Sequence, residues 1–100
     1  MIDRLEATLK RYDEITNDLS KTEVIQDIKK MTELSKEQTR LTEIVELYTK
    51  YKQILNGIEY AKELVKDSEL GEFAREELNL LETEKGEIEG SLEILLLPHD

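Results

Sequence analysis

The chain has 100 residues, of which 38% are hydrophobic and 38% charged, and its formal net charge is −10. This length suits one small domain with a modest core. The absence of cysteine excludes disulfides and thiolate metal sites. No apolar run reaches signal-peptide length or the roughly 20 residues of a membrane-spanning helix. We therefore expect a protein of a reducing, cytoplasmic setting with no membrane partner. We also expect it to be helical, since only four glycines and one proline are present to interrupt helices.

The charge is distributed unevenly along the chain. Residues 27–66 carry seven acids and eight bases, whereas residues 67–100 carry eleven acids and two bases. A segment as acidic as the last third should repel a phosphate backbone and prefer a basic protein surface. The middle segment is the better candidate for contact with RNA.

The first predicted element is a helix over Ile2–Leu19, where apolar residues recur at steps of three and four. The connector of residues 20–27 should hold one short turn capped by Thr22. Val24 and Ile25 would then pack against the bundle.

A second apolar series predicts one long helix between Asp27 and Lys66, with Asp27 as its N-cap. The only glycine in this span is Gly57, which we expect to be a weak point. At 1.5 Å per residue the helix would be roughly 57 Å long, which is typical of a coiled-coil-like arm. The series comprises Ile28, Met31, Leu34, Leu41, Ile44, Val45, Tyr48, Tyr51, Leu55, Ile58 and Val65.

A third series predicts a helix over Glu69–Leu95, capped by Asp67 or Ser68 and ended by Pro98. The break before it is too short for anything but a reversal, so the second and third helices should lie antiparallel. The predicted fold is all-α, an elongated antiparallel three-helix bundle with a long coiled-coil-like helical hairpin. The series comprises Leu70, Phe73, Ala74, Leu78, Leu81, Ile88, Leu92 and Leu95.

Nothing in the sequence forms a catalytic or metal-binding set, and no cofactor is expected. The single histidine, His99, has neither cysteine nor a second histidine to share a metal with. Glutamate pairs such as Glu76–Glu77 fall mostly off the apolar series, which indicates a solvated face rather than acid–base chemistry. Glycines 86 and 90 indicate either close approach of another segment or a tolerated local weakness.

Tyrosines are expected to serve packing more than chemistry. Tyr12, Tyr48 and Tyr51 lie on or near apolar series, so their rings should enter the core with the hydroxyl at the rim. Tyr60 lies off the series and is a candidate for an exposed contact.

Two stretches form an ordered set of motifs. The first is Leu34-Ser35-Lys36-Glu37-Gln38, followed by Leu41, Ile44-Val45, Tyr48 and Tyr51-Lys52. The second is Phe73-Ala74-Arg75-Glu76-Glu77-Leu78, followed by Leu92-Glu93 and Leu95-Leu96-Leu97-Pro98. Together they resemble the first domain of bacterial class I peptide chain release factors. The ending is similar to the branch that reads UAA and UAG, although His99 stands where that family usually has lysine.

The resemblance covers essentially the whole chain and implies a role in translation termination. It implies that residues 1–97 are the helical N-terminal domain of a longer protein, and that residues 98–100 begin the linker to its central domains. The family's Gly-Gly-Gln tripeptide, which promotes hydrolysis of peptidyl-tRNA, does not occur in this sequence. The chain is therefore expected to be no enzyme but a projecting helical arm. The implied partners are the stalk-base region of the large ribosomal subunit and the GTPase release factor that recycles the protein.

A group of basic residues in the middle segment is the candidate contact with ribosomal RNA or an acidic protein. Acidic residues are interleaved among them, so ordinary solubility is the favoured interpretation. The group comprises Lys29, Lys30, Lys36, Arg40, Lys50 and Lys52.

Two other interpretations remain open. A stand-alone coiled-coil interaction module would complete its apolar series across a tight dimer, whereas the isolated release-factor domain should be a monomer. The helical arm of an aminoacyl-tRNA synthetase should be basic along its length to hold tRNA, and the acidic last third argues against it.

Overall fold

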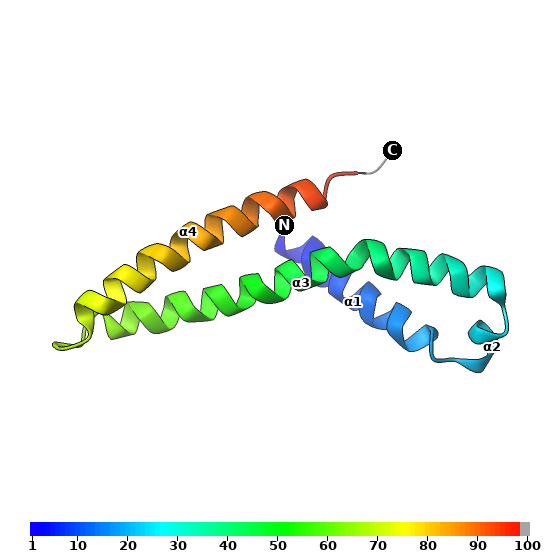
Figure 1. The fold of residues 1–100 in the computed structure, drawn as a ribbon, viewed down its shortest axis with the longest axis horizontal. Coiled ribbons are helices and arrows are strands. Elements are labelled where there is room, and N and C mark those ends of the chain that lie inside the picture. The colour runs from blue at the N-terminus through cyan, green and yellow to red at the C-terminus, as the bar shows by residue number, and fades with distance from the viewer. Residues whose placement is uncertain (99–100) are drawn as a thin grey trace. The chain divides into compact units, whose positions relative to one another are not determined.

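The computed structural model describes residues 1–98, and every regular element in that range is an α-helix (Figure 1). The elements are α1 (Ile2–Asp18), α2 (Thr22–Ile25), α3 (Ile28–Leu64) and α4 (Gly71–Leu95). The all-α prediction is confirmed, as are the three long helices to within two residues at each end. His99 and most of the predicted linker lie outside the described residues.

The chain divides into two compact units, residues 1–46 and residues 47–100. The first contains α1, α2 and the N-terminal part of α3. The second contains the remainder of α3 and α4. Among the described residues, no helix combines the length and the apolar character needed to cross a membrane.

In the first unit, α1 and the beginning of α3 run in opposite directions and are joined through α2 (Figure 1). Four side chains of this unit are less than 10% exposed: Leu5, Ile15, Val24 and Ile44. The prediction that Ile25 packs beside Val24 is wrong, because Ile25 is 50% exposed. Adjacent residues point about 100° apart on a helix, so a single turn can direct only one of the two into the core.

The two caps predicted from aspartates differ in outcome from the one predicted from threonine. Asp27 accepts a hydrogen bond from the Lys30 N–H at 3.1 Å and so caps α3 as expected. Thr22 is not a cap, since Lys21 precedes α2 in extended conformation and no side chain caps that helix. Asp67 accepts the N–H groups of Glu69 and Leu70, at 2.8 and 2.9 Å. It thereby caps the turn before α4, which begins two residues later than predicted.

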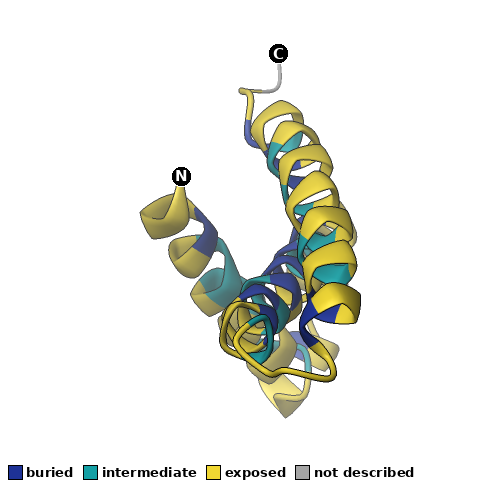
Figure 2. Ribbon diagram, turned by 90° about the vertical axis from the view of Figure 1, so that its left-hand side faces the viewer, coloured by how far each residue is buried: buried dark blue, intermediate teal, exposed yellow. Residues whose placement is uncertain are grey.

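The second unit is the predicted antiparallel hairpin. Gly57 of α3 lies beside Leu81 of α4, and Tyr51 of α3 is hydrogen-bonded to Glu89 of α4. The earlier residue of α3 pairs with the later residue of α4, so the two helices run antiparallel. Its buried apolar side chains form short stretches on each helix (Figure 2): Tyr48, Tyr51, Ile54, Ile58, Ala61, Ala74, Ile88, Leu92 and Leu96.

The predicted apolar series differ from the core at several positions. Ile54, Ala61 and Leu96 are buried but were not in the series, because two closely packed helices bury a face wider than one residue per turn. Conversely, Ile28 is 81% and Phe73 60% exposed. Both stand in the first turns of their helices.

The glycines of the helices fall into two classes. A Cβ at Gly57 would lie 3.3 Å from Leu81 Cδ1, and one at Gly71 would lie 2.8 Å from the backbone oxygen of Val65. Gly57 was expected to be a weak point, and it is a point of close approach within a continuous α3. A Cβ at Gly86 or Gly90 would meet nothing within 4 Å in the described residues. These two fit the interpretation of tolerated helix weakness.

This difference predicts opposite effects for one substitution at two sites. Gly90→Ala should stabilise the chain by about 1 kcal/mol, because alanine restricts the unfolded backbone and favours helix. Gly71→Ala should destabilise it by about 1–3 kcal/mol, because the Val65 carbonyl must move. Urea unfolding followed by circular dichroism measures both. Equal stability of the two variants would contradict the close approach at Gly71.

Candidate functional site

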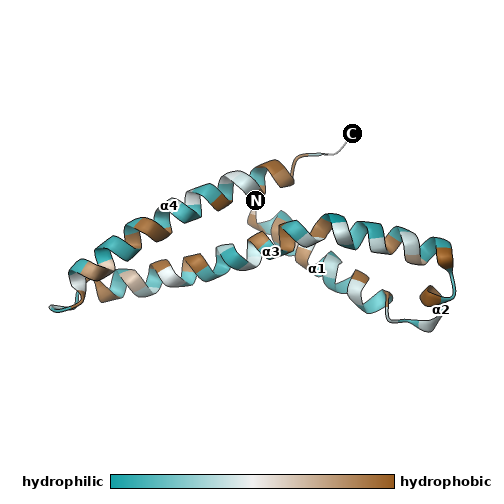
Figure 3. Cartoon of the chain, in the orientation of Figure 1, coloured by the Kyte–Doolittle hydropathy of each residue, from teal (hydrophilic) through white to brown (hydrophobic). Residues whose placement is uncertain are grey.

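The described residues offer neither a metal site nor a buried polar cluster. No group of three or more histidine, cysteine, aspartate or glutamate side chains in residues 1–98 is arranged to hold a metal ion. No polar or charged residue of that range is buried, and no buried side-chain nitrogen or oxygen atom there lacks a hydrogen-bond partner. Polar and apolar positions alternate along α3 and α4 (Figure 3). The candidate functional features are therefore surfaces.

The predicted basic group is only partly brought together. Lys29, Lys36 and Arg40 are exposed and lie within roughly 40° of one another around α3, at 100° per residue. They lie to one side of the buried Ile44, which points about 40–80° away from them around the helix. We call these three residues the basic face. Lys30 belongs to the same turn as Lys29 but points about 100° away from it.

The other two members of the group lie in the second unit. Lys50 is exposed there. The Lys52 ammonium lies 4.5 Å from the centre of the Tyr48 ring, a cation–π contact. Lys52 is thus already engaged in its own unit, so it is a weaker candidate for contact with a partner.

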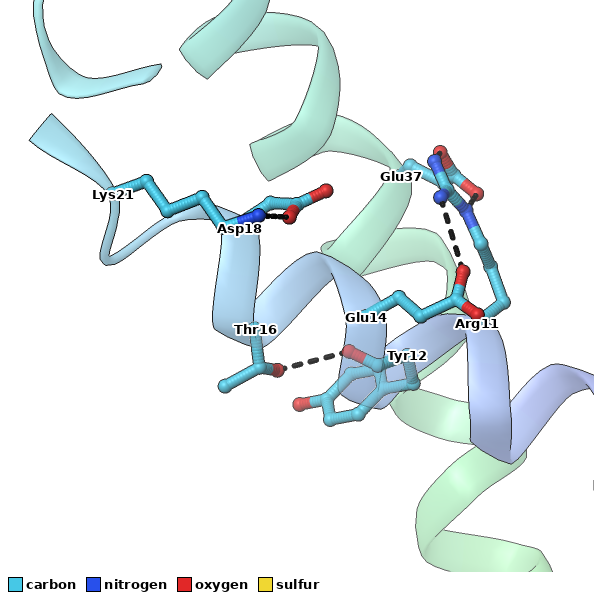
Figure 4. A network of polar contacts seen from close by, with 7 residues as sticks. All are labelled: Arg11, Tyr12, Glu14, Thr16, Asp18, Lys21 and Glu37. Atoms are coloured by element: carbon cyan, nitrogen blue, oxygen red, sulfur yellow. Dashed lines mark hydrogen bonds and ion pairs between the residues drawn. The ribbon is translucent and has the colours of Figure 1, made fainter. Parts of the chain in front are cut away.

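One bidentate ion pair ties α1 to α3 beside the basic face. The Arg11 guanidinium donates two hydrogen bonds of 2.7 Å to the Glu37 carboxylate, and Glu14 approaches it at 3.7 Å (Figure 4). The hydrogen bond to Glu37 raises the pKa of Arg11, and Arg11 in turn lowers the pKa of Glu37 against the opposing effect of burial. Parallel N–H···O bonds fix orientation as well as distance. The pair therefore sets how α1 lies along α3.

A second polar contact lies at the end of α1. Lys21 pairs with Asp18 at 2.9 Å, which lowers the pKa of Asp18 and raises that of Lys21 (Figure 4). Lys21 is exposed and Asp18 partly exposed to solvent, so the pair shapes the chain's exit from α1 more than it stabilises the fold.

In the second unit, one hydrogen bond crosses from α3 to α4. The Tyr51 hydroxyl donates to the Glu89 carboxylate at 2.7 Å, while the ring is 5% exposed. Burial, followed by the bond to Glu89, raises the pKa of Tyr51 from 10.0 to about 12. The prediction of a buried ring with its hydroxyl at the rim is confirmed for Tyr51. Glu89 thus departs from the expectation that the paired glutamates lie on a solvated face.

A groove between α3 and α4 is the feature that the sequence did not predict. It has a volume of about 450 Å³ and lies near the chain reversal. Tyr60 and Phe73, at its edges, are 70% and 60% exposed. The exposure of Tyr60 was expected from its position off the apolar series. Phe73 was assigned to the core, and only the packed hairpin shows otherwise. The groove is lined by Gly57, Tyr60, Ala61, Leu64, Phe73, Ala74, Glu77 and Leu81.

Comparison with known proteins gives consistent matches. The PCRF domain matches residues 8–100. Peptide chain release factor 1 of Helicobacter pylori (strain J99 / ATCC 700824) is 49% identical over 100 residues, all of this chain and 28% of that protein. The protein of the same name from Campylobacter concisus (strain 13826) is 50% identical over 98 residues, 98% of this chain and 28% of its own length. The chain thus spans 28% of the length of these relatives. No solved structure matches significantly.

The Arg11–Glu37 pair predicts a stability difference that depends on pH. Because the pKa of Glu37 is lowered in the folded state, its contribution is present above the usual value of 4.5 and is lost as the pH falls through the lowered value. Glu37→Gln should cost about 1 kcal/mol at pH 7, a modest figure because the pair is partly exposed. Urea unfolding at pH 7 and pH 2 should show that difference shrink in acid. Glu14→Gln is the control, with a loss of a few tenths of a kcal/mol. A Glu37→Gln deficit that persists unchanged at pH 2 would rule out the charged pair as its cause.

The Tyr51–Glu89 bond predicts an alkaline effect. Tyr51→Phe should cost about 1 kcal/mol at pH 7 by removing the donor to Glu89. Since the folded-state pKa of Tyr51 is raised, its contribution is intact below pH 10 and is lost as the pH rises towards about 12. The stability of the native chain should therefore approach that of the variant over this range. Tyr60→Phe, at an exposed ring, should change stability by less than about 0.5 kcal/mol. If both substitutions cost the same, the bond to Glu89 contributes nothing.

Proposed function

The chain belongs to the PCRF domain family, and we propose that it is the non-catalytic helical arm of a release factor that acts in translation termination. The observation that carries this proposal is the similarity to release factor 1 proteins over the whole chain. In this role the arm helps to direct release of the nascent peptide at UAA and UAG codons. The longer protein supplies the hydrolysis of peptidyl-tRNA.

The proposal assigns the arm a binding role in the cytoplasm. Residues 1–97 would be the N-terminal domain, with residues 98–100 leading into further domains. The partners would be the ribosome, at the stalk base of its large subunit, and the GTPase that recycles the factor.

The basic face is the part of this surface that suits ribosomal RNA. Its three cations are exposed on one side of α3 and can meet phosphate oxygens without desolvating a buried charge. Glu33 and Glu43 lie close by on the same side, so the expected attraction is moderate. Lys30, Lys50 and Lys52 would contribute less, because the structure does not gather them with the other three.

A reconstituted termination assay tests both the role and the basic face. These 100 residues would replace the matching segment of Helicobacter pylori release factor 1, and the chimera should release peptide at UAA. Reversing the basic face (Lys29→Glu, Lys36→Glu, Arg40→Glu) should raise KM at least threefold with little change in kcat. Loss of phosphate contacts weakens association with the ribosome and leaves the distant chemistry intact.

A second charge reversal controls for net charge. Lys10→Glu, Lys62→Glu and Lys66→Glu make the same change at exposed sites off the basic face and should leave KM within twofold. A chimera that binds ribosomes but releases nothing would overturn the termination role. Equal effects of the two reversals would remove the basic face from the proposal. The isolated chain should hydrolyse no peptidyl-tRNA, as expected without Gly-Gly-Gln.

A further inference from the structure

The groove between α3 and α4 is apolar, open and flanked by two exposed aromatic rings. Three of its lining residues, Gly57, Ala61 and Ala74, are small, and a Cβ at Gly57 would lie 3.3 Å from Leu81 Cδ1 of the facing helix. Tyr60 and Phe73 stand at its edges and leave most of their surface in water. Burying an aromatic side chain in an interface removes a large apolar area from water at low conformational cost. This combination is typical of the anchoring centre of a protein interface.

The charge around the groove determines what could cover it. Glu77 lines the groove, Glu84 stands two turns further along the same side of α4, and we call this edge the acidic rim. Residues 57–85 as a whole carry nine acids and four bases, a net charge of −5. Two of those bases, Lys62 and Lys66, already pair with acids one turn earlier, Glu59 at 3.7 Å and Glu63 at 3.2 Å. An occupant with cationic side chains would be attracted to this rim.

The same charge disfavours two other occupants. A second copy would bring its own acidic rim against this one, and like charges facing each other across an interface cost free energy. A nucleic-acid strand would place phosphates beside glutamates. A basic protein segment with apolar side chains is the occupant that suits both the apolar lining of the groove and its acidic rim.

We propose that the groove between α3 and α4 binds a basic amphipathic helix of a partner protein. Apolar side chains of that helix would enter between Tyr60 and Phe73, and its lysines or arginines would face the glutamates of the rim. This mode lays one apolar helical face into a groove, with anchors three to four residues apart. The inference depends on the groove and its charge, and it holds whether or not the chain acts in termination.

Fluorescence anisotropy with three synthetic probes tests the inference on the 100-residue chain. The first probe is a fluorescein-labelled 14-residue helical peptide with leucine on one face and lysine on the other. The second keeps the lysines but has serine at every leucine, and the third keeps the leucines but has glutamate at every lysine. The first should bind, and the other two should bind at least tenfold more weakly. Failure of the first probe to bind at 1 mM would overturn the proposal.

Variants of the chain locate the binding. Phe73→Ala and Tyr60→Ala should each weaken binding of the first probe at least fivefold. The matched control is Leu80→Ala, which removes a 60% exposed apolar side chain of α4 that does not line the groove and should change binding less than twofold. All three positions are exposed, so circular dichroism should show unchanged folding.

Two further outcomes would rule out the groove as the binding site, and a third would change its occupant. Equal binding of the serine peptide would show attraction by charge alone and would overturn the groove. An equal loss in Leu80→Ala would do the same. Sedimentation showing a dimer that Phe73→Ala dissociates would make a second copy the occupant.

Discussion

Close approach of α3 and α4 at the chain reversal is the constraint on which the second unit depends. Gly57, Ala61, Gly71 and Ala74 stand where the two helices turn back on each other, and Gly71 leaves no room for even a methyl group beside Val65. Small residues let helix axes approach and allow larger side chains further along to interdigitate. Three of these small residues, Gly57, Ala61 and Ala74, also line the groove, so the residues that let the hairpin close also shape its apolar groove.

Polar bonds in both units lie at the rim of the core and set how the helices align. Arg11 fixes α1 on α3 through Glu37, and Tyr51 fixes α4 on α3 through Glu89. An apolar core alone tolerates slippage by a helical turn, because leucine and isoleucine fit several arrangements. A directional bond with one partner does not tolerate it. Placing these bonds at the rim avoids the cost of burying an unpaired charge.

The sequence predicted helix bounds well because they depend on local signals. Asp27 bonds to an amide three residues away, and apolar spacing reports one helix face without knowledge of its partner. Positions that depend on the partner helix were predicted poorly. Ile54 is buried and Phe73 exposed because of where α4 meets α3, and no spacing rule contains that information. The groove was missed for the same reason, although Tyr60, off the apolar series, was one sign of it.

The basic face and the acidic groove belong to different units of the chain, and the two kinds of contact can be distinguished by salt. The basic face would meet phosphate through exposed charges alone, so its attraction falls steeply as ionic strength rises. The groove around Tyr60 and Phe73 adds apolar burial to its acidic rim, and burial of apolar area is not screened by salt. A contact that survives at high ionic strength therefore belongs to the groove.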